Sequence, residues 1–309
     1  MPRIEPRPRG AAPPGGAGGV PRPACAPLLR RVAIGTLLIC TVAGPGHAGQ
    51  GAVPAATATP APAISPDTAI ASAAANGSSS GANNAARATA GLRAHAIVYR
   101  GTFMGIGAGT LELTLRPGAT PGSWVYETRP NPSFLASFAI NPKSRERSSF
   151  ELDAEGRVAP LGYRLDDGTS AHKDNVELAY LRSRGRITGS SRGAAVDLPL
   201  EPGTQDVMSI RLATPVDLLA GREPADYPMV DGSELKHFVY RRVGPQRIRT
   251  ALGELDTIVF TSERKGADAR DRTWRYWFAP SLGWLPVRIE QRQEGRTRLE
   301  FEVRALRWL

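Results

Sequence analysis

The chain has 309 residues, of which 41 % are hydrophobic and 22 % charged, and its formal net charge is +10. Six of the 39 basic and one of the 29 acidic residues lie within residues 1–48, which leaves 33 against 28, a net charge of +5. A nucleic-acid partner would call for a basic stripe of one sign with interleaved aromatic residues, so we expect no nucleic-acid binding.

Residues 1–48 have the features of a signal peptide. Arg30 and Arg31 directly precede an apolar run over residues 32–43, which is too short to span a bilayer. The segment Gly46-His47-Ala48 then supplies small residues at the two positions that a signal peptidase reads. We therefore predict export across the inner membrane to the periplasm, with no membrane-spanning segment left after cleavage.

Both cysteines of the chain, Cys25 and Cys40, lie inside this predicted signal. The exported chain would then hold no disulfide, no thiolate metal site and no thiol nucleophile.

Residues 49–92 consist mainly of Ala, Gly, Pro, Ser, Thr and Asn, with almost no charge and few large apolar side chains. Such a segment buries too little surface to offset the entropy of ordering it, so we predict a disordered tether. The remaining residues 93–309 match the upper size of a single all-β domain.

Apolar and polar residues alternate with a period of two through most of residues 93–309. In the last run, Leu299, Phe301 and Val303 share one face. The charged residues that alternate with them share the other face, and they are Arg298, Glu300, Glu302 and Arg304. Turn clusters that contain Gly, often with Pro or Asp, separate these runs at short intervals, which indicates hairpins. We predict an all-β fold, a large curved antiparallel sheet that could form a half-barrel, and the sequence leaves open whether its edges close.

Two helical signals interrupt the strands. Residues 205–213 carry Met208 and Leu212 at helical spacing, and Thr214-Pro215 then has the pattern of a second helix start. We expect a short helix–helix patch that covers one face or one mouth of the sheet.

Three of the five tryptophans lie within residues 273–290, a strand–turn–strand pattern. Trp274, Tyr276 and Phe278 share one face because successive side chains of a strand alternate. Trp277 points the opposite way, so either both faces of the sheet are covered there or one ring lines a cavity. In the turn, Gly283 is expected to have a positive φ.

Several short pieces of sequence, of which the aromatic block is the most specific, carry a family resemblance. They are Val98-Tyr99, the hairpin Gly105–Gly109, Phe150–Pro160 with its D-x-E-G turn, Gln205–Ser209, and Gly283 with Leu285–Glu290. Over most of residues 95–306 the chain resembles the exported bacterial family known as domain of unknown function 3108. The resemblance implies a periplasmic, mainly antiparallel β protein, similar to the open half-barrels of lipoprotein carriers, and it supplies no catalytic residue.

No motif in the sequence predicts a catalytic, metal or cofactor site. The predicted exported part has three histidines, His95, His172 and His237, without a Gly-x-Ser-x-Gly or H-E-x-x-H pattern. Arg182, Arg184 and Arg186 share a face that could meet an anionic lipid headgroup or a polysaccharide, but a solvated sheet edge is the better explanation.

A curved sheet beneath a helical patch favours a non-catalytic function, the binding of a lipid, an acyl chain or another amphiphile in a slot. The expected lining of that slot is Met208, Leu212, Trp274, Tyr276 and Phe278. The alternative is an envelope scaffold that binds a partner protein and has a filled core. A third class, a polysaccharide or cell-wall hydrolase, requires acidic or histidine side chains that converge in one cleft. A fourth class, an outer-membrane barrel, is disfavoured by the helical patch and the resemblance.

Overall fold

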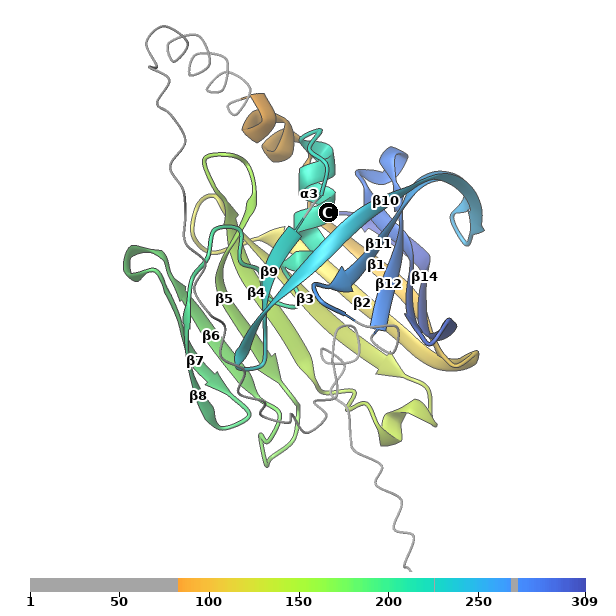
Figure 1. Cartoon of the computed structure of the whole chain (residues 1–309). Helices are drawn as coiled ribbons and strands as arrows, with labels where there is room; N and C mark the ends of the chain where they lie inside the picture. The colour runs from red at the N-terminus through yellow and green to blue at the C-terminus, as the bar shows by residue number, and fades with distance from the viewer. Residues whose placement is uncertain (1–82, 225, 268–271) are drawn as a thin grey trace, which may run out of the picture. The chain divides into compact units, whose positions relative to one another are not determined.

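The computed structural model describes residues 83–224, 226–267 and 272–309, which form one antiparallel sheet of 14 strands with short helices (Figure 1). The strands are β1 (His95–Phe103), β2 (Ile106–Pro117), β3 (Ser123–Pro132), β4 (Arg145–Leu152), β5 (Val158–Asp166), β6 (Val176–Leu181), β7 (Arg186–Ser191), β8 (Ala194–Pro199), β9 (Asp226–Asp231), β10 (Glu234–Thr250), β11 (Gly253–Arg264), β12 (Arg272–Ala279), β13 (Leu285–Gln293) and β14 (Arg296–Trp308). The helices are α3 (Ile210–Leu219), the 3₁₀ turns η1 (Ala136–Phe138), η2 (Arg182–Arg184) and η3 (Pro280–Leu282), and a helix over residues 83–91.

The sheet consists of two meanders joined at its centre. Its order is β8-β7-β6-β5-β4-β3-β2-β1-β14-β13-β12-β11-β10-β9, so the first and last strands pair with each other, from His95 opposite Trp308 to Phe103 opposite Leu299. The edge strands β8 and β9 are not paired with one another, and the segment that carries α3 connects them along the chain. This confirms the predicted all-β fold with a large antiparallel sheet, and it shows that the sheet is open.

The sheet curves around α3, and this helix contacts strands from both halves of the sheet (Figure 1). Arg211 lies beside Glu146 of β4, Asp217 accepts a hydrogen bond from Tyr227 of β9, and Leu218 packs on Phe260 and Phe278 of β11 and β12. Eight of the ten residues of α3 are buried. The helix therefore fills the concave side of the sheet, as the predicted helical patch was expected to do.

The prediction that a second helix begins at Thr214 is wrong, because α3 continues through Pro215 to Leu219. Proline at the sixth position removes one backbone hydrogen bond, the one to the carbonyl of Arg211. The burial of the helix on both sides compensates for that loss, so tertiary packing overrides the local start signal.

The part of the predicted disordered tether that the structure describes is ordered. Residues 83–91 are helical, and Ala88 and Leu92 belong to the hydrophobic core. The small alanine side chains let this helix approach the β4–β5 turn at Gly156 closely, and alanine favours helix formation. The rest of the predicted tether, residues 49–82, and the predicted signal, residues 1–48, lie outside the described residues.

None of the helices in the described ranges combines the length and the hydropathy needed to cross a bilayer.

Candidate functional site

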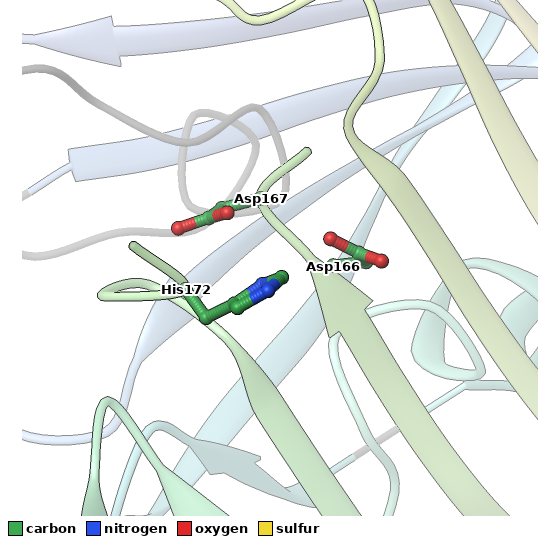
Figure 2. A group of neighbouring side chains, drawn as sticks. All are labelled: Asp166, Asp167 and His172. Atoms are coloured by element: carbon green, nitrogen blue, oxygen red, sulfur yellow. The ribbon is translucent and has the colours of Figure 1, made fainter. Parts of the chain in front are cut away.

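Only one group of three potential metal ligands occurs among the described residues, at the β5–β6 turn (Figure 2). It consists of Asp166, Asp167 and His172. The carboxylate of Asp167 already accepts hydrogen bonds from both donors of Thr169 and from the amide of Asp174. Burial alone would raise the pKa of Asp167, but these hydrogen bonds outweigh it and lower the pKa. The group is thus explained as the hydrogen-bonded frame of a turn.

The other histidines and the predicted arginine face lie elsewhere. His95 is buried against Trp308, with its Nδ1 2.8 Å from the carbonyl oxygen of Arg93, and burial lowers its pKa. The Nε2 of His237 lies 3.4 Å from a carboxylate oxygen of Glu201. Two members of the arginine face form ion pairs, Arg182 with Glu151 at 3.7 Å and Arg186 with Asp197 at 2.7 Å. Arg182 and Arg184 lie in η2 and only Arg186 lies in a strand, β7, so the prediction that the three share one strand face is wrong.

Two polar anchors hold α3 inside the sheet, and the first lies at its N-terminal end. Asp206 is fully buried; its Oδ1 accepts hydrogen bonds from the amides of Met208 and Ser209, both at 2.8 Å. Its own amide donates to the hydroxyl of Ser209, which completes a reciprocal cap. Its Oδ2 accepts a hydrogen bond from Ser148 of β4 at 2.7 Å, so the cap also ties the helix to the sheet. Burial raises the pKa of Asp206, and these hydrogen bonds oppose the rise.

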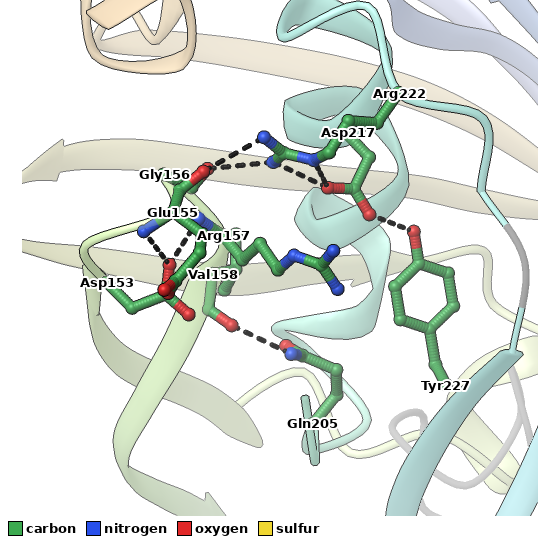
Figure 3. Close-up of polar contacts among 9 residues, drawn as sticks. All are labelled: Asp153, Glu155, Gly156, Arg157, Val158, Gln205, Asp217, Arg222 and Tyr227. Carbon is green, nitrogen blue, oxygen red and sulfur yellow. Dashed lines mark hydrogen bonds and ion pairs between the residues drawn. The ribbon is translucent and has the colours of Figure 1, made fainter. Parts of the chain in front are cut away.

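The second anchor lies at the C-terminal end of α3 (Figure 3). Arg222 forms an ion pair with Asp217 at 2.6 Å and donates to the carbonyl oxygens of Glu155 and Gly156 in the β4–β5 turn. Asp217 also accepts a 2.6 Å hydrogen bond from Tyr227 of β9. Nearby, the side-chain amide of Gln205 donates to the carbonyl of Val158. The D-x-E-G turn and the segment from Gln205 to Ser209, which carry the family resemblance, are thus the pieces that fix the helix in place.

A buried pair of opposite charges lies between these anchors. The side chains of Arg211 on α3 and Glu146 on β4 are 8 % and 3 % exposed, and the closest distance between them, from Nη2 to Oε2, is 3.9 Å. This distance is too long for a hydrogen bond. Nε and Nη2 of Arg211 and Oε2 of Glu146 find no hydrogen-bond partner among the described residues. Such unsatisfied charged groups are costly to bury, and each one calls for an explanation.

The charge of Arg211 influences the groups around it. Burial raises the pKa of Glu146 to about 7; Arg211 opposes this rise, and the neighbouring Asp206 adds to it. Burial also raises the pKa of four tyrosines, and the charge of Arg211 opposes the rise in each case. They are Tyr99, Tyr126, Tyr240 and Tyr276.

An aromatic wall lies against the same face of α3. The rings of Trp274, Tyr276 and Phe278 follow one another along β12, with centroids 6.4 and 5.7 Å apart, and Tyr240 of β10 stacks on Tyr276 at 5.8 Å. Between this wall and the helix lies a cavity of about 20 Å³, enough for a single water molecule. Its lining is Ile210, Arg211, Thr214, Tyr240, Tyr276, Phe278, Pro286 and Ile289.

The structure brings together only part of the predicted slot. Tyr276 and Phe278 line the cavity, whereas Met208, Leu212 and Trp274 do not line it and are buried in the main core. The predicted turn geometry is confirmed, since Gly283 has φ of 66°. Trp277 lies on the opposite face of β12, where its indole N–H donates to Gln246 and the guanidinium of Arg275 lies 4.9 Å from its ring centroid. Both faces of the sheet are therefore covered at this point.

Neither Arg211 nor Glu146 is among the site residues predicted from the sequence, although each leaves a signal there. Arg211 is the only charged residue between Asp206 and Asp217. Glu146 lies in a strand between the exposed Arg145 and Arg147, so alternation assigns it to the buried face. A charge on a predicted core face indicates an interior polar site, but its partner became visible only when the helix was placed on the sheet.

Solved structures similar to this chain share low sequence identity with it. A β-barrel-like protein of the DUF1849 family from Brucella abortus is 13 % identical, with a TM-score of 0.42, and the match covers 71 % of this chain and 98 % of that one. MucB in its complex with MucA from Pseudomonas aeruginosa is 14 % identical, with a TM-score of 0.29 and coverage of 75 % and 57 %. No curated protein matches the sequence significantly.

A family model matches residues 98–301, which is most of the described chain. The matched range includes the β4–β5 turn, the capped start of α3 and the aromatic strand β12. The chain belongs to the family described as protein of unknown function DUF3108.

Proposed function

We propose that this protein binds an amphiphile in the periplasm, with the apolar chain of the ligand against the aromatic wall and its anionic head at Arg211. The observation that carries the proposal is the buried guanidinium of Arg211, two of whose nitrogens lack acceptors beside an otherwise apolar cavity. A negatively charged head group would supply the missing acceptors in the form of charge-assisted hydrogen bonds. The apolar and aromatic lining would take up the hydrocarbon chain.

The cavity is too small for an acyl chain as it stands, so binding requires α3 to move away from the aromatic wall. The architecture supports such a movement. The helix belongs to the connection between the two unpaired edge strands, β8 and β9, and its displacement would break no strand pairing within the sheet. Release of the polar anchor at one end would let the helix pivot on the anchor at the other.

The small cavity also supports a second candidate function, an envelope scaffold whose core is filled and whose outer face binds a protein.

A hydrolytic function receives less support from the interior. Glu146 and Asp206 are neighbouring buried carboxyls, but both oxygens of Asp206 are engaged by the cap and by Ser148. A general base needs a free oxygen within reach of a substrate proton, and of the two carboxyls only Glu146 has one, so the pair of converging groups that a hydrolase requires is incomplete.

The test compares two fluorescent probes, a fatty acid and a fatty alcohol, on the wild type and on Arg211→Gln. A buried charge-assisted hydrogen bond contributes about 1.5–3 kcal/mol, so the variant should bind the fatty acid about 10–100-fold more weakly. Its affinity for the neutral alcohol should change little. Arg241→Gln, at a site whose side chain is 68 % exposed, is the matched control and should behave as the wild type. Absence of binding of either probe to the wild type would contradict the proposal and favour the scaffold.

A further inference from the structure

Six large apolar side chains are exposed at one end of the sheet, each between 50 % and 78 %. Three belong to the β1–β2 hairpin and three to the loop between β3 and β4, which contains η1. They are Phe103, Met104, Ile106, Phe134, Leu135 and Phe138. We call this set the apolar rim. Large apolar groups that cluster on a surface mark an interaction site, whereas single ones do not.

The two segments of the apolar rim form one surface. The amide and the hydroxyl of Ser133 donate hydrogen bonds to the carbonyls of Ala108 and Gly107, at 3.1 and 3.0 Å. Gly109 has φ of 111°, and a Cβ there would clash with the carbonyl of Asn131, so the hairpin and β3 are in direct backbone contact. The loop thus lies fixed against the hairpin.

The loop also holds its own rings in place. The rings of Phe134 and Phe138 meet edge to face, with centroids 5.3 Å apart. Backbone hydrogen bonds close the turn between them, from Ser137 to Ser133 and from Ala139 to Ala136. The exposed rings are therefore presented by a defined turn of the chain.

The two segments that carry the apolar rim are basic. Residues 100–111 and 128–145 contain four basic residues and no acidic residue. Lys143 is exposed in the rim loop, and Arg145 donates to the carbonyls of Pro142 and Ser144, with no carboxylate partner among its described contacts. Neighbouring turns at the same end hold acidic residues, Asp166 opposite Arg145 and Glu294 in an ion pair with Arg298, so the excess of basic charge belongs to the rim segments themselves. Apolar side chains on basic segments complement a surface that is apolar inside and anionic outside.

We propose that the apolar rim docks onto the surface of an anionic lipid bilayer. Phenylalanine, leucine and isoleucine side chains on projecting turns can enter the boundary between headgroups and acyl chains, while the basic residues contact lipid phosphates. A second copy of the chain fits less well, because two apposed rims would bring the basic segments of both copies together. The rim also leads to the interior. A cavity of about 30 Å³ behind it is lined by Pro132 and Ile140 and by the core residues Leu111, Leu299 and Phe301.

The test is a flotation assay, in which the full-length protein, purified without detergent, is mixed with one of two kinds of lipid vesicle. One kind is phosphatidylcholine alone, and the other is phosphatidylcholine mixed with phosphatidylglycerol. The wild type should float with the anionic vesicles, and more weakly as salt is added. The double variant Phe134→Ser, Phe138→Ser should lose about tenfold or more of this partitioning, since two rings no longer enter the interface.

The matched control is Val243→Ser with Leu252→Ser, two exposed apolar residues outside the rim, which should float as the wild type does. Flotation of the rim variant equal to the wild type, or no flotation of the wild type with anionic vesicles, would overturn the proposal. Self-association that the rim variant abolishes, without vesicle binding, would overturn it in favour of a contact between copies. Fatty-acid binding in solution should be unchanged in the rim variant, so this proposal and the proposed interior site succeed or fail separately.

Discussion

Replacing Asp206 by alanine is expected to lower the free energy of unfolding by about 2–4 kcal/mol. Loss of an N-terminal helix cap costs about 0.5–2 kcal/mol, and a buried hydroxyl left without its acceptor costs about 1–3 kcal/mol more. Both losses apply here, since Asp206 caps α3 through two amides and accepts from the buried Ser148. Urea denaturation followed by circular dichroism measures the change.

Ser148→Ala separates the two contributions, because it removes only the hydroxyl and keeps the cap. It leaves Oδ2 of Asp206 without its donor, so it should cost about 1–3 kcal/mol, which is less than the loss caused by Asp206→Ala. If Asp206→Ala changed stability by no more than an ordinary surface substitution, about 0.5 kcal/mol, the cap would not be the anchor of α3.

Replacing Glu146 by glutamine is expected to change the pH dependence of stability. The pKa of Glu146 is raised from 4.5 to about 7, so between these values the folded chain binds a proton that the unfolded chain has released. The contribution of Glu146 to the free energy of unfolding is therefore fully present below the pKa of the unfolded chain. This contribution is lost as the pH rises through about 7, the pKa of the folded chain. At about 1.4 kcal/mol per pKa unit, the loss is on the order of 3 kcal/mol.

Glutamine cannot ionise, so the stability of Glu146→Gln relative to wild type should increase between acidic pH and about pH 8 by up to that amount. Glu151→Gln is the control, since Glu151 lies on the same strand with a side chain that is 45 % exposed. Melting temperatures recorded across the pH range give the comparison. Parallel curves for wild type and Glu146→Gln would mean that the carboxyl ionises normally in the folded protein.

The strands were predictable because alternation and turn residues are local signals. Trp274, Tyr276 and Phe278 share a face in the structure as the period of two requires, and Gly283 adopts the positive φ that its turn needs. The wrong prediction of a helix start at Thr214-Pro215 arose because distant contacts override a local signal. The local pattern is that of a helix start, but burial of α3 between the two halves of the sheet depends on contacts far away in the sequence.

The interior charges and the apolar rim depend on such distant contacts as well. Glu146 and Arg211 lie 65 positions apart, and only the packing of α3 on β4 brings them within 3.9 Å. Phe134 and Phe138 are four positions apart, a spacing that in a sequence indicates a buried helical face. The structure instead places both rings on the surface, because the loop that carries them projects beyond the ends of the strands.

Native mass spectrometry of the protein purified from its own cells without detergent tests the central claim, amphiphile binding at Arg211, most directly. The account predicts a complex of one chain with one anionic amphiphile for the wild type. It predicts the unliganded mass for Arg211→Gln, with Arg241→Gln still loaded. Wild-type protein that shows only the unliganded mass, and stays so after incubation with fatty acid, would contradict the claim and leave the filled-core scaffold as the better description.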